Sequence, residues 1–440
     1  MNQPGTEGFK MEMYNITGGR KLVGQVDVAG SKNTALAIMS AVVLAEGTTV
    51  LHNVPDVSDT RTKARLLATF GAKVEWNEGS LSVDCTELFN AVADEELVRS
   101  IRTSFYLLGP IVARIGRVDL PAPGGCKIGA RPVDFHLKGL ASLGADVQLE
   151  NGIYTIRADE LVGCEIYFDF PSAGATQHLM SAATLAKGVT VLQNAAMEPE
   201  VVALADFLNR MGARIEGAGT STITIQGVKA LHPCEFRIPS DRLQAGTYML
   251  AGAITYGDVQ VNGIVPEHQI AVVSKLREMG CDVTEGHDWV RVRGDQALRA
   301  AKIKTMPYPG FPTDMQQPMA ALMTLAEGTS VVDETIYESR IGHVQELNRM
   351  GAQIIQKGQT SIIDGVEKLS AAHVAASDLR AGAALVLAAL ATEGETTVRN
   401  IHFIDRGYDG LEETLRMLGG RIERVDVSDK LTLRTGDSTH

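Results

Sequence analysis

A cysteine in a glycine-rich, cationic stretch is the first feature of this sequence that could do chemistry. The segment PAPGGCKIGARPVD, residues 121–134, places Cys126 directly before Lys127 and five residues before Arg131. A core cysteine normally lies among apolar neighbours, whereas a reactive one needs some exposure and nearby positive charge, which favours the thiolate. We therefore expect Cys126 to have a functional role as a reactive thiol.

The other four cysteines have the context of packed residues. Cys85, Cys164 and Cys234 lie on or beside strand-like runs, and Cys281 occupies a position that holds alanine or glycine in related segments. An odd number of cysteines without a secretory signal predicts free thiols in a reducing cytoplasm. No zinc-type cysteine spacing and no close histidine pair occur, so we expect no metal site and no other cofactor.

Charged residues at expected helix starts suggest an anion-binding site. In GSKNTAL, Lys32 stands at a helix start, where its charge opposes the helix dipole. A cation is favourable there if an anion also binds, because free backbone N–H groups and the lysine then face the same ligand. Asn33 could add an amide hydrogen bond. Arg102 occupies the equivalent helix start in RSIRTSF, and Arg131 follows the cysteine.

Further charged residues lie near equivalent positions in the second half of the chain. Asp314 in FPTDMQ could take part in acid–base chemistry or simply cap its helix, and the sequence leaves both readings open. The stretch SDLRAG contributes Asp378 and Arg380, and IDRGY contributes Arg406. If these helix ends face one cleft, that cleft is strongly cationic in a chain of net charge −12 and suits polyanionic substrates. Its cations would be Lys32, Arg102, Arg131, Arg380 and Arg406.

Six copies of one unit must position these residues. LAEGTTVLHNV from Leu44 returns as LAKGVTVLQNA from Leu185 and as LAEGTSVVDET from Leu325, and weaker copies fill the intervals. A second glycine in each unit follows an apolar helical pattern and precedes a strand-like run, as a helix C′ glycine does. These glycines are Gly71, Gly144, Gly212, Gly280, Gly351 and Gly419.

The repeats predict an α/β fold with two lobes of three units each. The length of 440 residues exceeds a single simple core, and each unit is too long for a small solenoid repeat. We expect the chain to cross between lobes near Pro239. The expected first lobe is then residues 32–239, which carries the Cys126 segment, and the second comprises residues 1–31 and 240–440.

Composition and motifs exclude several classes of function. The net charge disfavours a general nucleic-acid binder or a protein that binds anionic membranes, and no apolar run approaches the length of a membrane span. The sequence has no phosphate-binding P-loop, no GxSxG elbow, no HExxH and no dinucleotide GxGxxG after a strand. We therefore expect a cytoplasmic protein that acts on small anionic molecules.

The motifs together resemble the UDP-N-acetylglucosamine 1-carboxyvinyltransferases, a family of enolpyruvyl transferases. GSKN, GGCKIGARPVD, FPTDMQ, SDLRA and IDRGY occur in the family's order, and the resemblance runs from about residue 14 to residue 425. It implies two inside-out α/β barrels of three repeats each. It also implies transfer of the enolpyruvyl group of phosphoenolpyruvate to the 3′-hydroxyl of UDP-N-acetylglucosamine with release of phosphate, the first committed step of peptidoglycan synthesis, without a cofactor.

The same resemblance assigns roles to individual residues. Lys32 and Asn33 would bind phosphoenolpyruvate, with Arg131 and Arg406 flanking its anionic groups, and Lys32, Cys126 and Asp314 would be the catalytic residues. Cys126 would be a proton donor and the target of the epoxide antibiotic fosfomycin, and Asp314 would lie beside the attacking hydroxyl. The residues expected to hold substrate, besides those named above, are Arg102, Pro132, Val133, Asp134, Phe135, Ser172, Ile336 and Arg380.

Two other functions stay open at the level of sequence. 5-Enolpyruvylshikimate-3-phosphate synthase shares the fold and the donor, although the cysteine segment and GARPVD favour the nucleotide-sugar enzyme. A non-catalytic scaffold or ligand sensor could also retain the repeats, but it has no need of Lys32, Cys126, Asp314 and Arg406 together. Some relatives have lysine where this chain has Phe170, so we expect no cationic contact to the nucleotide diphosphate from that position.

Overall fold

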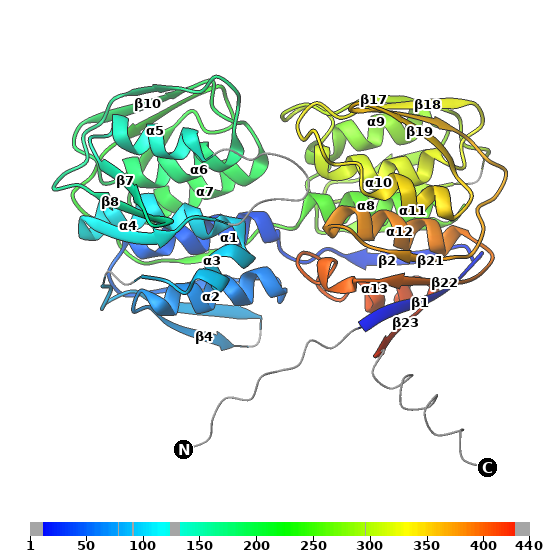
Figure 1. The fold of residues 1–440 in the computed structure, drawn as a ribbon, viewed down its shortest axis with the longest axis horizontal. Helices are drawn as coiled ribbons and strands as arrows, with labels where there is room; N and C mark the ends of the chain where they lie inside the picture. Colours follow the sequence, from blue (N-terminus) through cyan, green and yellow to red (C-terminus); the bar gives the residue numbers. More distant parts are fainter. Residues whose placement is uncertain (1–11, 78, 90–91, 124–132, 295, 427–440) are drawn as a thin grey trace, which may run out of the picture.

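Two hydrophobic cores divide the chain into two lobes (Figure 1). The computed structural model describes residues 12–77, 79–89, 92–123, 133–294 and 296–426. One core is built from residues between Ala35 and Ile238, and the other from residues between Tyr14 and Val28 together with residues from Leu243 to Ile422. We call the parts of the chain around these cores the first and the second lobe.

Each lobe has three small sheets in the described part of the chain. In the first lobe the strand orders are β13-β3-β5-β4, β6-β8-β7 and β11-β12-β10-β9. Their bounds are β3 (Thr48–His52), β4 (Lys73–Asn77), β5 (Ser80–Asp84), β6 (Arg117–Pro121), β7 (Asp146–Glu150), β8 (Ile153–Arg157), β9 (Glu165–Tyr167), β10 (Val189–Gln193), β11 (Arg214–Glu216), β12 (Thr222–Gln226) and β13 (Glu235–Arg237).

The second lobe repeats this plan with the orders β15-β16-β14-β2, β17-β18-β20-β19 and β21-β22-β1-β23. Its strands are β1 (Glu12–Gly18), β2 (Val23–Asp27), β14 (Asp258–Asn262), β15 (Asp282–Glu285), β16 (Trp289–Arg293), β17 (Lys302–Lys304), β18 (Thr329–Asp333), β19 (Gln353–Lys357), β20 (Thr360–Asp364), β21 (His373–Ala375), β22 (Gly394–Arg399) and β23 (Arg421–Asp426). A parallel pair next to antiparallel strands recurs in five sheets, for example β2 with β14 and β9 with β10.

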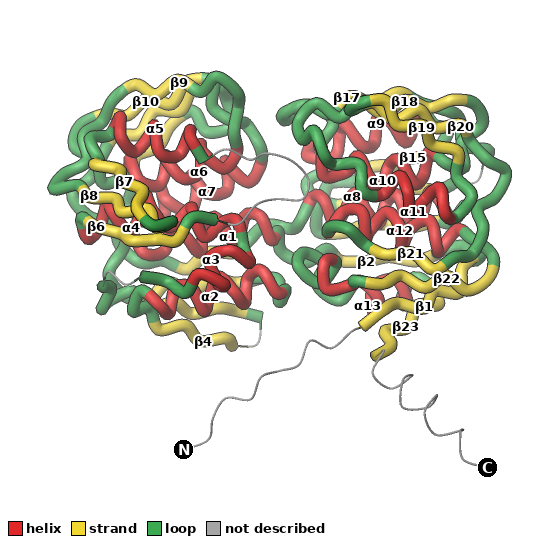
Figure 2. The backbone as a smooth tube through the Cα atoms, viewed as in Figure 1, coloured by secondary structure: helices red, strands yellow, loops and turns green. Residues whose placement is uncertain are grey.

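Helices fill the interior of each lobe and the sheets lie around them, as Figure 2 shows. The inner helices are α1 (Lys32–Ala41), α4 (Leu108–Ile115) and α6 (Ala173–Ala183) in the first lobe, and α8 (Arg242–Ile254), α10 (Thr313–Met323) and α12 (Leu379–Ala391) in the second. They are apolar on nearly all sides and rich in small residues, as expected of helices surrounded by protein. At Gly246 of α8, an added Cβ would lie 2.8 Å from the terminal methyl of Met315 on α10, so the glycine leaves room for that side chain between the two helices.

A second set of helices packs between the inner helices and the sheets. These are α2 (Ser58–Thr69), α5 (Asp134–Ser142), α7 (Pro199–Arg210), α9 (Ile270–Glu278), α11 (His343–Arg349) and α13 (Leu411–Met417). Shorter elements are α3 (Glu95–Ser100), η1 (Val42–Leu44), η2 (Arg102–Leu107), η3 (Pro266–Gln269) and η4 (Ile401–Phe403). Each helix of the second set is followed by one of the six predicted C′ glycines, and all six have φ between 91° and 103°.

The chain crosses between the cores twice, and the two crossing segments pair with each other. Gly30 and Ser240 form an antiparallel bridge, Ser31 N donates to Pro239 O at 2.7 Å, and Asp241 N donates to Ala29 O at 2.9 Å. Directly after these bonds the chain enters α1 in one lobe and α8 in the other. The helix starts that carry Lys32 and Arg242 are therefore held together at the junction of the lobes.

Candidate active site

Lys32 lies at the junction of the two lobes with its charge almost fully buried. Ser31 caps α1 by accepting from Thr34 N at 3.3 Å, which fixes the first turn. Lys32 N donates to Asp241 Oδ2 at 3.3 Å, and Lys32 Nζ donates to Asp59 Oδ2 at 3.1 Å. The Lys32 and Asp59 side chains are only 10% and 8% exposed. Burial raises the pKa of Asp241, which also caps α8.

Arg406 reaches the same carboxylate from the second lobe. Its Nε donates to Asp59 Oδ1 at 2.9 Å, and its Nη2 donates to Asp59 Oδ2 at 3.5 Å and to Ser100 O at 3.3 Å. Lys32 and Arg406, which are 374 positions apart by their numbers, thus share one counter-ion. Asp59 had no signal in the sequence, because Lys32 lies 27 positions away on another helix and Arg406 comes from the other lobe.

The segment that carries Arg102 is held on both sides. Ser100 O accepts from Arg406, and Thr103 O accepts from Lys63 Nζ at 2.7 Å. Lys63 lies on α2 and is fully buried, and this burial lowers the pKa of its ammonium well below the usual value. Arg102 is half-buried at the first position of η2, and Asn33 is half-buried beside Lys32. The structure thus brings Arg102 close to the contacts that Lys32 and Arg406 make.

Asp314 is the centre of a second cluster of charges, in the second lobe. Arg340 Nη1 lies 2.7 Å from Asp314 Oδ1, and Arg380 Nη2 lies 3.2 Å from Asp314 Oδ2. The N-cap of α10 is Pro312, with no side-chain hydrogen bond to the cap, so the reading of Asp314 as a helix cap is wrong. Two guanidinium groups instead fix the direction of its carboxylate, whose side chain is 26% exposed.

Both arginines of this cluster are buried. Arg340 and Arg380 have side chains that are 4% and 2% exposed. Arg380 Nη1 donates to the hydroxyl of Tyr408 at 3.0 Å, and that hydroxyl shares a 2.8 Å hydrogen bond with Thr247. Asp378 caps α12 through Arg380 N and Ala381 N. Sequence reasoning found Arg380 but missed Arg340, which lies in a loop without any motif.

The turn that contains Ile336 is tied to the start of α10 through Glu334. Glu334 Oε1 accepts from Ile336 N at 2.8 Å and from Tyr337 N at 3.1 Å, while Oε2 accepts from Thr313 Oγ1 at 2.8 Å. Arg340 Nη1 also donates to Thr313 Oγ1 at 2.9 Å. The fully buried Glu334 therefore holds Ile336 beside the helix start that carries Asp314.

The expected nucleotide-sugar residues of the first lobe lie at the starts of α5 and α6. Val133 is the N-cap of α5, and Asp134 at its first position forms a 3.5 Å ion pair with Lys138. Phe135 packs edge-to-face on Phe168 with the ring centroids 6.1 Å apart. Ser172 caps α6 by accepting from Ala175 N at 3.3 Å.

Three expected site residues, Cys126, Arg131 and Pro132, lie outside the described residues. The other cysteines have the surroundings of packed thiols, since Cys85 and Cys281 are buried and Cys164 and Cys234 half-buried. Burial raises the pKa of Cys85 to about 12 and also raises the pKa values of Cys164 and Cys234. Where the chain is described, no group of His, Cys, Asp or Glu side chains is arranged to hold a metal ion, and no helix is long and apolar enough to span a membrane.

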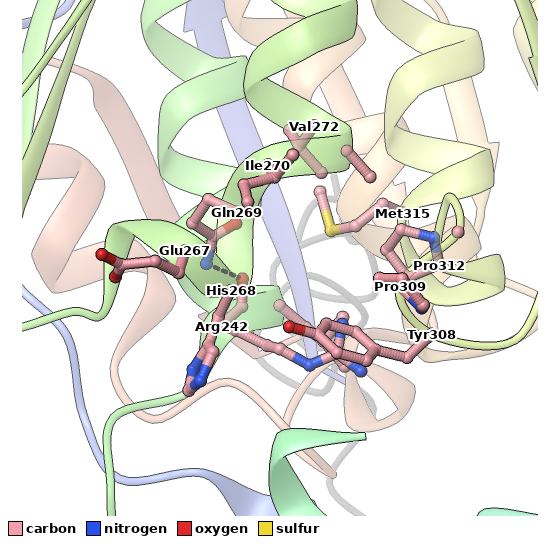
Figure 3. Close-up of a pocket in the computed structure, with 13 residues that line it drawn as sticks. Arg242, Glu267, His268, Gln269, Ile270, Val272, Tyr308, Pro309, Pro312 and Met315 are labelled. Carbon is pink, nitrogen blue, oxygen red and sulfur yellow. Dashed lines mark hydrogen bonds between the residues drawn. The ribbon is translucent and has the colours of Figure 1, made fainter. Parts of the chain in front are cut away.

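A small pocket of about 60 Å³ lies in the second lobe, near the starts of α8 and α10 (Figure 3). Arg242, His268, Tyr308, Pro312 and Met315 are among its lining residues, and none of the expected site residues lines it. The guanidinium of Arg242 lies 5.6 Å from the centroid of the Tyr308 ring and forms a 2.9 Å ion pair with Glu200 of the first lobe. Arg242 and Glu200 neutralise each other, whereas Lys32 and Arg406 share the single carboxylate of Asp59, so the pocket offers a polyanion less net positive charge than the junction around Asp59 does.

Comparisons of the sequence and of the structure with known proteins both find enolpyruvyl (1-carboxyvinyl) transferases. The profile of the family described as EPSP synthase (3-phosphoshikimate 1-carboxyvinyltransferase) matches residues 16–415. A UDP-N-acetylglucosamine 1-carboxyvinyltransferase of Trichlorobacter lovleyi is 49% identical, over 94% of this chain and 99% of the relative. The enzyme named UDP-N-acetylglucosamine 1-carboxyvinyltransferase 3 of Caldanaerobacter subterraneus is 48% identical, over 94% of this chain and all of the relative.

Solved structures confirm the architecture. The enolpyruvyl transferase NikO from Streptomyces tendae matches with a TM-score of 0.85 at 27% identity, over 94% of this chain and 99% of that chain. An EPSP synthase from Acinetobacter baumannii matches with a TM-score of 0.76 at 20% identity, over 94% of this chain and all of the other. The expected two-lobed inside-out α/β fold of six units is thereby confirmed.

Proposed function

The chain belongs to the EPSP synthase family and, within it, to the UDP-N-acetylglucosamine 1-carboxyvinyltransferases, and we propose that it works at the junction between its lobes. The reaction transfers the enolpyruvyl group of phosphoenolpyruvate to the 3′-hydroxyl of UDP-N-acetylglucosamine, releases phosphate and serves peptidoglycan synthesis. The observation that carries the proposed location is the meeting of Lys32 and Arg406, from different lobes, at Asp59.

The chemistry requires two anions to be held while protons move. In the addition, the 3′-hydroxyl oxygen bonds to C2 of phosphoenolpyruvate, and the methylene carbon of phosphoenolpyruvate takes up a proton and becomes a methyl group. In the elimination, the bond from C2 to the phosphate oxygen breaks as that methyl group loses a proton. Positive charge develops at C2 between a phosphate and a carboxylate, so both groups must be fixed by cations. We assign that task to Lys32, Arg131 and Arg406, with Asn33 as a further ligand of phosphoenolpyruvate.

We propose that Asp314 takes the proton of the attacking hydroxyl. Its carboxylate is oriented by Arg340 and Arg380 and keeps partial exposure on the second-lobe side. A general base needs such a fixed direction within hydrogen-bond reach of the proton it removes. Because Arg380 is buried behind Asp314, we propose that it supports the substrate site through that carboxylate. Cys126 supplies the proton to the methylene carbon in this scheme.

We propose that the nucleotide sugar binds along the first lobe and reaches Asp314 across the junction. Aromatic and backbone groups at the start of α5 suit a uracil ring, and the start of α6 suits a phosphate oxygen. This scheme needs no metal or organic cofactor. The proposed nucleotide-sugar ligands are Arg102, Arg131, Pro132, Val133, Asp134, Phe135, Ser172, Asp314 and Ile336.

The division into lobes and the cellular location are part of the same proposal. The chain passes from one hydrophobic core to the other between Val28 and Ala35, and it passes back between Ile238 and Leu243. This supports a first lobe of residues 32–239 and a second lobe of residues 1–31 and 240–440. The described cysteines are unpaired thiols, which supports a reducing cytoplasm, where small-molecule substrates rather than nucleic acid or membrane are the partners.

Phosphate release from phosphoenolpyruvate tests the function and the choice of acceptor. The purified chain is given phosphoenolpyruvate alone, with UDP-N-acetylglucosamine, or with shikimate 3-phosphate, the acceptor of the other enzyme class in this family. We expect phosphate release only with the nucleotide sugar, together with one enolpyruvyl group gained per sugar by mass spectrometry. Release with shikimate 3-phosphate alone, or with neither acceptor, would overturn the assignment.

A further inference from the structure

The start of α2 is the point at which the first lobe touches the 405–409 segment of the second. Ser58 N donates to Asp405 O at 3.1 Å, and Asp56 N donates to Asp409 Oδ2 at 3.0 Å. Asp59, the residue directly after Ser58, accepts from Arg406. Three contacts therefore join residues 56–59 to the loop that presents Arg406.

Asp59 contacts both cations while each retains further donors. An ammonium has three N–H donors and a guanidinium has five. Lys32 uses one Nζ donor on Asp59 Oδ2, and Arg406 uses its Nε and Nη2 edge. The carboxylate therefore fixes where the two side chains lie without exhausting their capacity to bind a second anion.

The two cations also lie close together, since Lys32 Nζ and Arg406 Nη2 both donate to Asp59 Oδ2. A Cβ added at Gly407 would lie 3.3 Å from Lys32 Nζ, so the backbone next to Arg406 packs against the lysine. Asp59 is a buried residue, and buried like charges repel strongly unless a counter-ion separates them. Without Asp59, Lys32 and Arg406 would repel each other with no counter-ion between them, and the hydrogen bond from Arg406 Nη2 to Ser100 O would remain to hold the arginine on the first lobe.

We propose that Asp59 is a positioning residue, which holds Lys32 of one lobe and Arg406 of the other in a preassembled site for the anionic groups of phosphoenolpyruvate. This inference rests on the proposed function and adds a residue to it. Asp59 touches no reacting atom and acts through the two cations. Its contribution is specific to the donor substrate, because the nucleotide sugar is held by other residues.

Substitution Asp59→Asn tests the proposal by steady-state kinetics. The variant keeps the shape of the side chain but loses the charge that binds both cations, so we expect kcat/KM for phosphoenolpyruvate to fall about 10-fold or more. The KM for UDP-N-acetylglucosamine should stay within about threefold of the unmodified chain. Asp56→Asn is the matched control, since its carboxylate pairs with the exposed Arg61 in the same segment and should leave both parameters unchanged.

A double-mutant cycle separates positioning from a merely structural role. Because Asp59 acts partly through Arg406, Asp59→Asn should lower kcat/KM by a smaller factor in the Arg406→Ala background than in the unmodified chain. Full additivity of the two substitutions would overturn the proposal, as would a KM for phosphoenolpyruvate that is unchanged in Asp59→Asn. If that variant does not fold, Asp59→Glu replaces it, with a raised KM for phosphoenolpyruvate expected and an unchanged KM contradicting us.

A binding measurement keeps the outcome independent of the proposed reaction. Inorganic phosphate should raise the melting temperature of the unmodified chain, and this rise should be smaller in Asp59→Asn than in Asp56→Asn. An equal rise in the two variants would contradict the role of Asp59. If phosphate binds as expected but the unmodified chain shows no turnover with UDP-N-acetylglucosamine, the reaction assignment fails and the role of Asp59 in anion binding stands.

Discussion

Asp314 shows how a residue at a helix start can be read in two ways that only its partners distinguish. Helix capping requires a hydrogen bond to the first-turn N–H groups, and Pro312 occupies the cap position instead. The carboxylate of Asp314 is bound by Arg340 and Arg380, which hold it in one orientation. Such a fixed carboxylate suits proton transfer.

We expect Asp314→Asn to lower kcat by about 10²-fold or more, the usual contribution of a general base, while changing the affinity for the nucleotide sugar much less. Phosphate release and calorimetric titration measure the two quantities. Asp364→Asn, which removes a carboxylate on β20 that accepts from Thr329, is the control and should retain full activity. Turnover within a few-fold of the unmodified chain would exclude Asp314 as the base.

Cys126 should be the most reactive of the five cysteines. Burial raises the pKa of Cys85, Cys164 and Cys234, which keeps them as unreactive thiols, whereas Lys127 and Arg131 favour the thiolate of Cys126. We expect the epoxide fosfomycin to alkylate Cys126, faster when UDP-N-acetylglucosamine is bound, and Cys126→Asp to retain activity and resist it. Peptide mapping decides, since a label on another cysteine with Cys126 free would contradict this role.

At the scale of elements, two buried histidines join three helices of the first lobe. Gly109 N of α4 donates to His178 Nε2 of α6 at 2.7 Å, so that nitrogen carries no proton. His178 Nδ1 therefore donates to His136 Nδ1 of α5, 3.1 Å away. Both rings must be neutral for this arrangement. Burial lowers the pKa of His136 to about 3 and lowers the pKa of His178 as well.

This pair predicts a loss of stability in mild acid. Both pKa values in the folded state lie below the usual 6.5. The contribution of the neutral pair to the free energy of unfolding is therefore complete above pH 6.5. It declines as the pH falls, because the unfolded chain takes up protons that the folded chain does not. Each histidine lowers the free energy of unfolding by up to about 1.4 kcal/mol for each pH unit of this fall. The free energy of unfolding can be measured with urea at several pH values. As the pH falls below 6.5, it should decrease less steeply for His178→Gln than for the exposed control His287→Gln. Equal slopes would contradict the neutral pair.

Much of the arrangement of elements could be predicted from the sequence, and the reason is local. The six C′ glycines mark helix ends because each must adopt positive φ, a requirement that neighbouring residues alone impose. A different glycine follows the inner helix of each unit, and there the fourth unit departs, since Tyr256 rather than Gly257 has positive φ, at 51°. Gly257 is needed there for another reason, as an added Cβ would lie 2.0 Å from Leu22 O, on a segment distant in sequence.

The site was predictable only where the residue itself carried the signal. Lys32 stands out because a cation at a helix start is unfavourable without an anion. Asp59, Arg340 and the buried position of Arg380 could not be predicted, because each depends on a charged partner that is distant in sequence and that only the fold brings near. Long-range pairs of charges leave no periodic pattern in a single sequence.

At the scale of the whole molecule, the two lobes are joined by charge as well as by the two crossing segments. Arg242 of the second lobe pairs with Glu200 of the first, with side chains 12% and 9% exposed, and Arg406 pairs with Asp59. Anionic substrates that bind between the lobes add attraction on both sides, so ligand should favour closure. We expect UDP-N-acetylglucosamine to lower the radius of gyration in small-angle scattering. An unchanged radius at saturating ligand would count against closure.

The central claim is that the substrates bind where cations of both lobes converge, and a crystal structure of the Asp314→Asn variant with phosphoenolpyruvate and UDP-N-acetylglucosamine tests it most directly. We expect the phosphoenolpyruvate anions to contact Lys32 and Arg406 and the sugar 3′-hydroxyl to lie beside residue 314. Substrates held by one lobe alone would contradict it. So would phosphoenolpyruvate in the pocket of Arg242, His268 and Tyr308, with Lys32 and Arg406 still bound only to Asp59.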